Sequence, residues 1–204
     1  MDMKTFFFAI LCIITSAAVA QERRLLYDVM RNGNVIGKID VTENVVGTRR
    51  MLIMTSAVKT RFVFAFTDNT YETAGYENGV LMYSTFHQNQ TGSSVANKST
   101  IFAGSLYKVT DNAVSTMVNF NRIRFGMLML YFHVPDTISK VFSGNYQKML
   151  DIKKEGDNRY RLSIPDGKYN YYTYKNGICS KVEIIRTMVS LQFVLREEQI
   201  IKPK

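Results

Sequence analysis

The sequence predicts a mainly β protein, built as an antiparallel, hairpin-rich meander. Asn-Gly pairs occur at residues 32–33, 78–79 and 176–177, and each is flanked by runs rich in Val, Ile, Tyr, Phe and Thr. Asn and Gly both tolerate the positive φ angles of tight turns, so each pair predicts a β-hairpin. Only three prolines occur, and none falls inside a predicted strand.

The first hairpin allows its register to be predicted. Leu25, Tyr27 and Val29 alternate on the incoming strand, and Ile39 and Val41 alternate on the outgoing one. A two-residue loop at 32–33 would place these two apolar sets on opposite faces. A three-residue loop at 32–34 pairs Arg31 with Val35 and Tyr27 with Ile39, which places both sets on one face, as a half-buried sheet requires. We therefore expect a three-residue turn with a bulge.

The last hairpin lies in the segment IPDGKYNYYTYKNGICSKVEI, residues 164–184. A two-residue loop at 176–177 pairs Tyr171 with Val182 and Tyr169 with Ile184, and these form an apolar face. Tyr172 and Tyr174 then cover the wetter face, where a tyrosine hydroxyl stays hydrated. The row of tyrosines therefore indicates sheet packing more than a binding surface.

The other predicted elements follow from local patterns. Between residues 121 and 146, the spacing of Ile123, Met127, Leu130 and Tyr131 predicts a short helix that ends before Pro135. Asp136 is expected to cap a second short helix through residues 140–142. Further strands are expected at 49–55, 59–66, 70–76, 80–88, 93–102, 105–109, 113–120, 148–153, 159–164 and 189–196.

Residues 1–20 have the pattern of a signal peptide. Lys4 precedes an apolar stretch at 5–15, and Ala18-Val19-Ala20 matches the small-x-small pattern that signal peptidase recognises. The stretch is shorter than the about 20 residues of a membrane-spanning helix. We expect cleavage between Ala20 and Gln21, a periplasmic or secreted protein, and a single domain over residues 21–204. An uncleaved anchor is the alternative.

Few residues suggest catalysis or metal binding. His87 and His133 have no partners at metal-ligand or triad spacing, and no nucleophile elbow or phosphate-binding loop occurs. Cys179 is the single cysteine after residue 20, so no internal disulfide is expected, and we predict that it is a small buried hydrophobe. The sequence assigns no catalytic residue, metal ligand or cofactor, and a non-enzymatic role is favoured.

The chain is basic, with a net charge of +9 that is scattered in small groups. An exported protein does not meet chromosomal DNA, so we expect no nucleic-acid partner. Anionic lipid head groups or envelope polyanions are the partners that such charge would attract. An ordinary solvated surface is the simpler interpretation.

Several motifs resemble a known family. They are LYFHVP at 130–135, KVFS at 140–143, YRLSIPDGKYNYYTYKNG at 160–177 and YDVMRNGNVIGKIDV at 27–41. Together they resemble small exported proteins, mainly from Bacteroidetes-type bacteria, that form a domain family of unknown function. More remotely, the chain resembles the curved half-barrel of periplasmic lipoprotein carriers. This resemblance implies a strongly curved antiparallel sheet, a half-barrel with an apolar concave side and one or two short helices. It transfers no catalytic residue.

These observations predict non-catalytic binding or carriage of an apolar or amphipathic envelope component, such as a lipid. Residues 123–141 are expected to cover or plug the concave side. The candidate ligand-lining residues are Phe125, Met127, Met129, Tyr131 and Phe132, because flexible Met and aromatic side chains suit irregular ligands. Ordinary core packing is the alternative for all five. An integral outer-membrane β-barrel and an envelope glycan hydrolase are the alternative functions.

Overall fold

The computed structural model describes residues 21–61, 65–185 and 190–201. The predicted signal peptide lies outside the described residues. The strands are β1 (Gln21–Arg31), β2 (Asn34–Val46), β3 (Arg49–Arg61), β4 (Ala65–Glu77), β5 (Val80–Gln90), β6 (Ala96–Ala103), β7 (Leu106–Asp111), β8 (Val114–Val118), β9 (Lys140–Ser143), β10 (Lys148–Lys154), β11 (Arg159–Ile164), β12 (Lys168–Lys175), β13 (Ile178–Ile185) and β14 (Ser190–Ile201). The 3₁₀ helices are η1 (Met127–Tyr131) and η2 (Pro165–Gly167).

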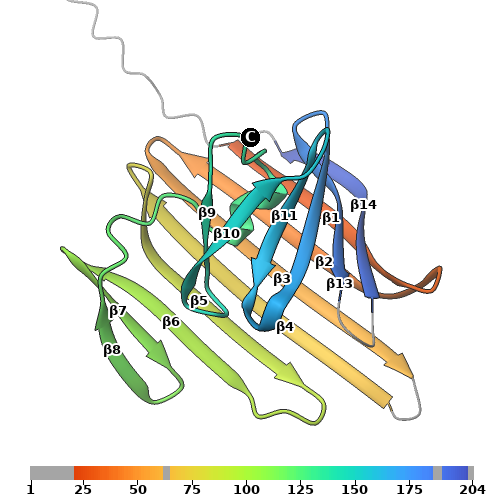
Figure 1. Cartoon of the computed structure of the whole chain (residues 1–204), viewed down its shortest axis with the longest axis horizontal. Coiled ribbons are helices and arrows are strands. Elements are labelled where there is room, and N and C mark those ends of the chain that lie inside the picture. The colour runs from red at the N-terminus through yellow and green to blue at the C-terminus, as the bar shows by residue number, and fades with distance from the viewer. Residues whose placement is uncertain (1–20, 62–64, 186–189, 202–204) are drawn as a thin grey trace, which may run out of the picture.

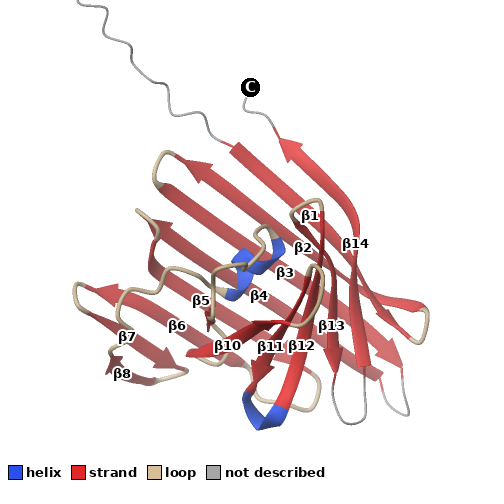
Figure 2. Cartoon of the chain, turned by 45° about the horizontal axis from the view of Figure 1, so that its top comes forward, coloured by secondary structure: helices blue, strands red, loops and turns tan. Residues whose placement is uncertain are grey.

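The described strands form one antiparallel sheet in the order β8-β7-β6-β5-β4-β3-β2-β1-β14-β13-β12-β11-β10-β9 (Figure 1). The first and last strands therefore pair in the middle of the sheet, and β8 and β9 are its two edges. The sheet curls so that β9 to β13 lie in front of β2 to β5, with η1 between them (Figure 2). This confirms the predicted mainly β, curved, open half-barrel.

The first hairpin corrects the predicted turn. The loop has two residues, because Arg31 pairs with Asn34 rather than with Val35. A bulge at Ile36 then shifts the register, so that Tyr27 still pairs with Ile39 as predicted. The apolar residues do share one buried face, but the extra residue lies in the outgoing strand instead of the loop.

The last hairpin corrects the predicted tyrosine faces. Its loop has two residues, but a bulge at Ser180 shifts the register, and Val182 pairs with Tyr172 instead of Tyr171. Because a shift of one residue exchanges the two faces, Tyr172 and Tyr174 are buried in the core. The outward-facing Tyr169 and Tyr171 lie under arginine side chains, with Arg161 4.6 Å from the first ring centroid and Arg159 4.0 Å from the second.

The structure also corrects the predicted helices. Only Met127–Tyr131 within the first is helical, as a 3₁₀ turn, and the second predicted helix is instead strand β9. Asp136 caps no helix and accepts a hydrogen bond from the Tyr160 hydroxyl. The predicted strands at 49–55 and 59–66 are also wrong as separate elements, because β3 continues through residues 56–58 in pairing with β4. In the described part of the chain, no helix is long and apolar enough to cross a membrane.

Candidate ligand-binding cavity

A segment that we call the plug, residues 123–141, fills one end of the half-barrel. Its residues Ile123, Leu128 and Leu130 are fully or almost fully buried. Buried tyrosines satisfy part of its backbone: the Tyr174 hydroxyl donates to the Leu130 carbonyl (2.8 Å), and the Tyr107 hydroxyl accepts from the Ile123 amide (3.1 Å). Because partners outside the segment bond its backbone, the plug is buried without being a regular helix. The predicted covering of the concave side is confirmed.

The rest of the concave side holds a cavity of about 640 Å³, a volume typical of small-molecule sites. Its lining residues are mostly apolar. They are Ile36, Ile39, Met54, Ser56, Val58, Thr60, Phe66, Asp68, Thr70, Glu72, Phe86, Gln88, Gln90, Met127, Tyr131, Ser143, Asn145, Tyr146, Ile164, Asn170, Tyr172, Val182, Ile184, Leu191 and Phe193.

The cavity lies between the plug and the opposite end of the sheet. Its residues from β2 to β5 come from the strand halves that lead to the turns at 32–33 and 91–95, away from both chain termini. Met127 and Tyr131 of η1 form part of its inner wall. Thr60 and Gln90, at the C-terminal ends of β3 and β5, also line the cavity and are half-exposed. The cavity is therefore closed by the plug at one end and accessible at the other.

Glu72 is a buried acid in the wall of this cavity, on β4. Burial raises its pKa to about 7, and a hydrogen bond from the backbone of Gly144 limits the rise. The approach is close, because a Cβ atom at Gly144 would lie 2.6 Å from Glu72 Oε1 and 2.8 Å from Ser84 Oγ. A side chain at position 144 would therefore have to displace this carboxyl or the Ser84 hydroxyl.

A second acidic residue, Asp68, lies on the same strand. Its carboxylate accepts hydrogen bonds from the Thr70 hydroxyl (3.1 Å) and from the Gln88 side-chain amide (3.1 Å). Since side chains at alternate positions of a strand share a face, residues 68, 70 and 72 form a polar line along the cavity wall. Apolar side chains on the neighbouring strands surround this line.

A cluster of polar and charged side chains fixes the plug to the sheet at the closed end. His133 of the plug contacts Glu43 of β2 (Nε2 to Oε1, 2.7 Å), and the guanidinium groups of Arg50 and Arg23 lie 3.2 Å and 3.5 Å from the same carboxylate. Burial alone would raise the Glu43 pKa, but the hydrogen bond and charge of His133, with the charges of Arg50 and Arg23, lower it. His133 therefore joins the plug to β2.

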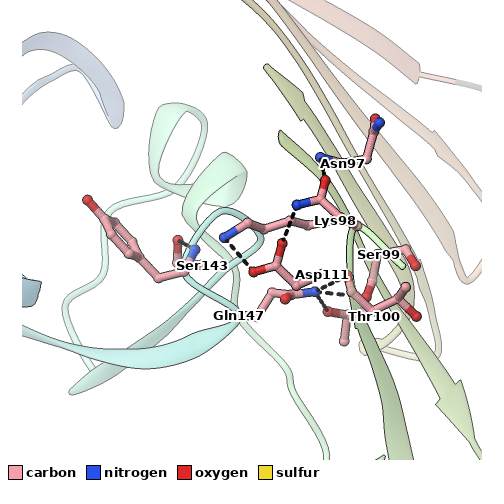
Figure 3. A network of polar contacts seen from close by, with 10 residues as sticks. Asn97, Lys98, Ser99, Thr100, Asp111, Ser143 and Gln147 are labelled. Atoms are coloured by element: carbon pink, nitrogen blue, oxygen red, sulfur yellow. Dashed lines mark hydrogen bonds and ion pairs between the residues drawn. The ribbon is translucent and has the colours of Figure 1, made fainter. Parts of the chain in front are cut away.

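A side chain joins the two arms of the curved sheet. Gln147, in the turn between β9 and β10, points toward β6 and β7 (Figure 3). Its amide nitrogen donates to the carbonyl oxygens of Ser99 (2.9 Å) and Thr110 (3.0 Å). Because the same turn carries Asn145 and Tyr146 into the cavity wall, this contact positions one side of the cavity.

Of the five predicted lining residues, the structure places only Met127 and Tyr131 at the cavity. Met129 and Phe132 are buried within the plug, and Phe125 is half-buried against the core. Cys179 is fully buried, as predicted, and burial raises the pKa of its thiol to about 12. The second histidine, His87, contacts Asn97 on an exposed part of the sheet (Nδ1 to Oδ1, 2.6 Å).

Sequence reasoning missed Glu72 and most of the cavity wall. One signal was available: Glu72 alternates with Ala74 and Tyr76, which are core residues of the same strand. A charged residue in register with a buried face indicates a functional or paired carboxyl. No group of three or more His, Cys, Asp or Glu residues within the described ranges is arranged to hold a metal ion.

The chain belongs to the family described as domain of unknown function DUF6134, whose model matches residues 27–196. Its structure is similar to the crystal structure of a β-barrel-like protein of domain of unknown function DUF1849 from Brucella abortus, with a TM-score of 0.63 and 9% sequence identity. That match covers 91% of this chain and 100% of the other. At this identity the likeness shows the fold alone. Comparison with curated proteins found no match.

Proposed function

We propose that this protein binds or carries an apolar or amphipathic component of the cell envelope in its concave cavity, without catalysing a reaction on it. The observation that carries the proposal is the cavity of about 640 Å³ between the plug and the accessible end of the half-barrel. Burial of apolar ligand surface there would contribute roughly 0.8 kcal/mol per methylene group. The signal-peptide pattern of residues 1–20 supports a site of action outside the cytoplasm.

The polar residues of the wall support an amphipathic ligand over a purely apolar one. Asp68, Thr70 and Glu72 form their line within an otherwise largely apolar lining. A few placed polar groups in an apolar pocket are the usual means by which a protein orients a small ligand. Asp68 and Glu72 lie four positions apart on one strand, a rise of about 13 Å, whereas the carboxyl groups of glycosidases lie about 5–9.5 Å apart, so the glycan hydrolase alternative gains no support.

Native mass spectrometry of the protein purified from bacterial envelopes tests this proposal. Wild type should carry a co-purifying small amphiphile, and Thr70→Trp, which fills the cavity, should lose it. Asn69→Trp is the matched control, because Asn69 is exposed on the opposite face of the same strand. Equal ligand occupancy in the two variants, or no ligand and no binding of added amphiphiles by wild type, would overturn the proposal.

A further inference from the structure

The cavity is acidic although the protein is basic. The chain has a net charge of +9, yet the charged side chains among the described cavity-lining residues are Asp68 and Glu72. No lysine, arginine or histidine occurs among those described lining residues. An anionic head group in this cavity would therefore meet two carboxyls and no described lining cation, whereas a cationic group would meet opposite charge.

Glu72 is placed to contact such a group. Only 8% of the Glu72 surface is exposed, and Glu72 lines the cavity together with the plug residue Tyr131. A carboxylate has two oxygens with about four acceptor positions, and the Gly144 backbone accounts for one hydrogen bond. Acceptor capacity therefore remains on a carboxyl that borders the cavity.

We propose that Glu72 binds the basic nitrogen of an amphipathic amine, whose apolar part lies against Met54, Val58, Phe86 and Phe193. This inference rests on the proposed function and specifies its ligand class. An ammonium group donates charge-assisted hydrogen bonds to a carboxylate, and such bonds are about twice as strong as neutral ones. A buried carboxylate without a cation is costly, so the ammonium both neutralises and satisfies it. Asp68, farther along the same wall, attracts the amine toward the cavity.

Isothermal titration calorimetry with three ten-carbon probes tests the inference: decylamine, decanol and decanoic acid, at about pH 8, where the Glu72 carboxyl with its pKa of about 7 is mostly ionised. Wild type should bind decylamine at least about tenfold more tightly than decanol, and decanoic acid most weakly. Glu72→Gln keeps the side-chain volume and should remove the preference for the amine while leaving decanol affinity within about threefold. Asp68→Asn should reduce the preference less.

The outcomes separate this inference from the proposed function. Binding of decanol or decanoic acid at least as tightly as decylamine would overturn the amine assignment and leave the amphiphile site in place. An equal loss of all three affinities in Glu72→Gln would also overturn it, since that result indicates a structural role for Glu72. Failure of every probe to bind wild type would count against the proposed function itself. Circular dichroism of each variant controls for folding.

Discussion

Burial of the Glu72 carboxyl lowers the stability of the folded protein at neutral pH. The residues that pair with Glu72 on the neighbouring strands are the apolar Met54 and Phe86. A carboxyl in this setting loses hydration that one backbone hydrogen bond replaces only in part. Burial raises its pKa from an ordinary value of 4.5 to about 7, so the folded state binds a proton more tightly than the unfolded chain does. Proteins retain such costs mainly at functional sites.

The raised pKa of Glu72 makes the stability of the protein depend on pH. The stabilising effect of the protonated Glu72 is fully present below about pH 4.5 and is lost as the pH rises through about 7. Glu72→Gln should therefore be more stable than wild type above pH 7, by about 3 kcal/mol, and similar to it below pH 4.5. Urea unfolding across this range measures the difference. A difference that does not change with pH would show that Glu72 titrates normally.

The pKa shift of Glu43 is opposite in direction to that of Glu72. Its pKa is lowered, so the stability that it contributes is present above the unfolded-state pKa and is lost as the pH falls through the folded value. Glu43→Gln should cost about 2 kcal/mol at neutral pH, because it leaves Arg23 and Arg50 beside the plug without their carboxylate. The loss of stability caused by Glu43→Gln should be smaller at acidic pH.

Glu77→Gln is the control for Glu43, because it removes a carboxylate that pairs with Arg49 on an exposed part of the sheet. That change should cost less than about 1 kcal/mol. Equal losses in the two variants, measured by urea unfolding at neutral pH, would mean that the cluster around His133 does not anchor the plug.

At the scale of elements, the three Asn-Gly hairpins share one construction. Each has a two-residue loop, and each has a bulge at the third residue of the outgoing strand: Ile36, Met82 and Ser180. Each bulge moves the later pairs by one residue and so exchanges the faces of the strand beyond it. Bulges also increase local twist, which suits the curvature of this sheet.

This construction explains why one hairpin was predicted better than another. In the first, strict alternation of apolar residues required a shift, so the Tyr27–Ile39 pair was predicted even though the extra residue was assigned to the loop. In the last, tyrosines occupy both faces, and a tyrosine suits either a core or a wet face. The pattern therefore contained no signal for the bulge at Ser180, and the faces were predicted in reverse.

The turn between β9 and β10 holds the two arms of the sheet together through Gln147. Gln147→Glu removes both N–H donors and places a carboxylate against the carbonyl oxygens of Ser99 and Thr110. We expect a loss of about 1–3 kcal/mol and faster amide hydrogen exchange in β6 and β7. Lys148→Ala, at the exposed next position, should change neither. Unchanged exchange in Gln147→Glu would show that the two arms are held together by other contacts.

At the scale of the whole molecule, the sequence predicted the sheet and the plug but not the cavity. Local patterns determine strands and turns, so the meander was readable from turn residues and alternation. The cavity exists because a curved sheet encloses more space than the plug fills, and it depends on strands that are far apart in the sequence. Met127 and Tyr131 could be predicted as lining residues because they lie in the plug. To predict Glu72 as a lining residue, one must know which face of β4 borders the cavity.

The space between the plug and the accessible end of the half-barrel is the proposed ligand site. The most direct measurement is a crystal structure of the protein with decanol, a neutral probe whose binding does not depend on the amine inference. We expect decanol density within the half-barrel, in contact with Met127 and with the walls at Val58 and Phe193. Side chains that fill this space, or density found only on the convex face, would contradict it.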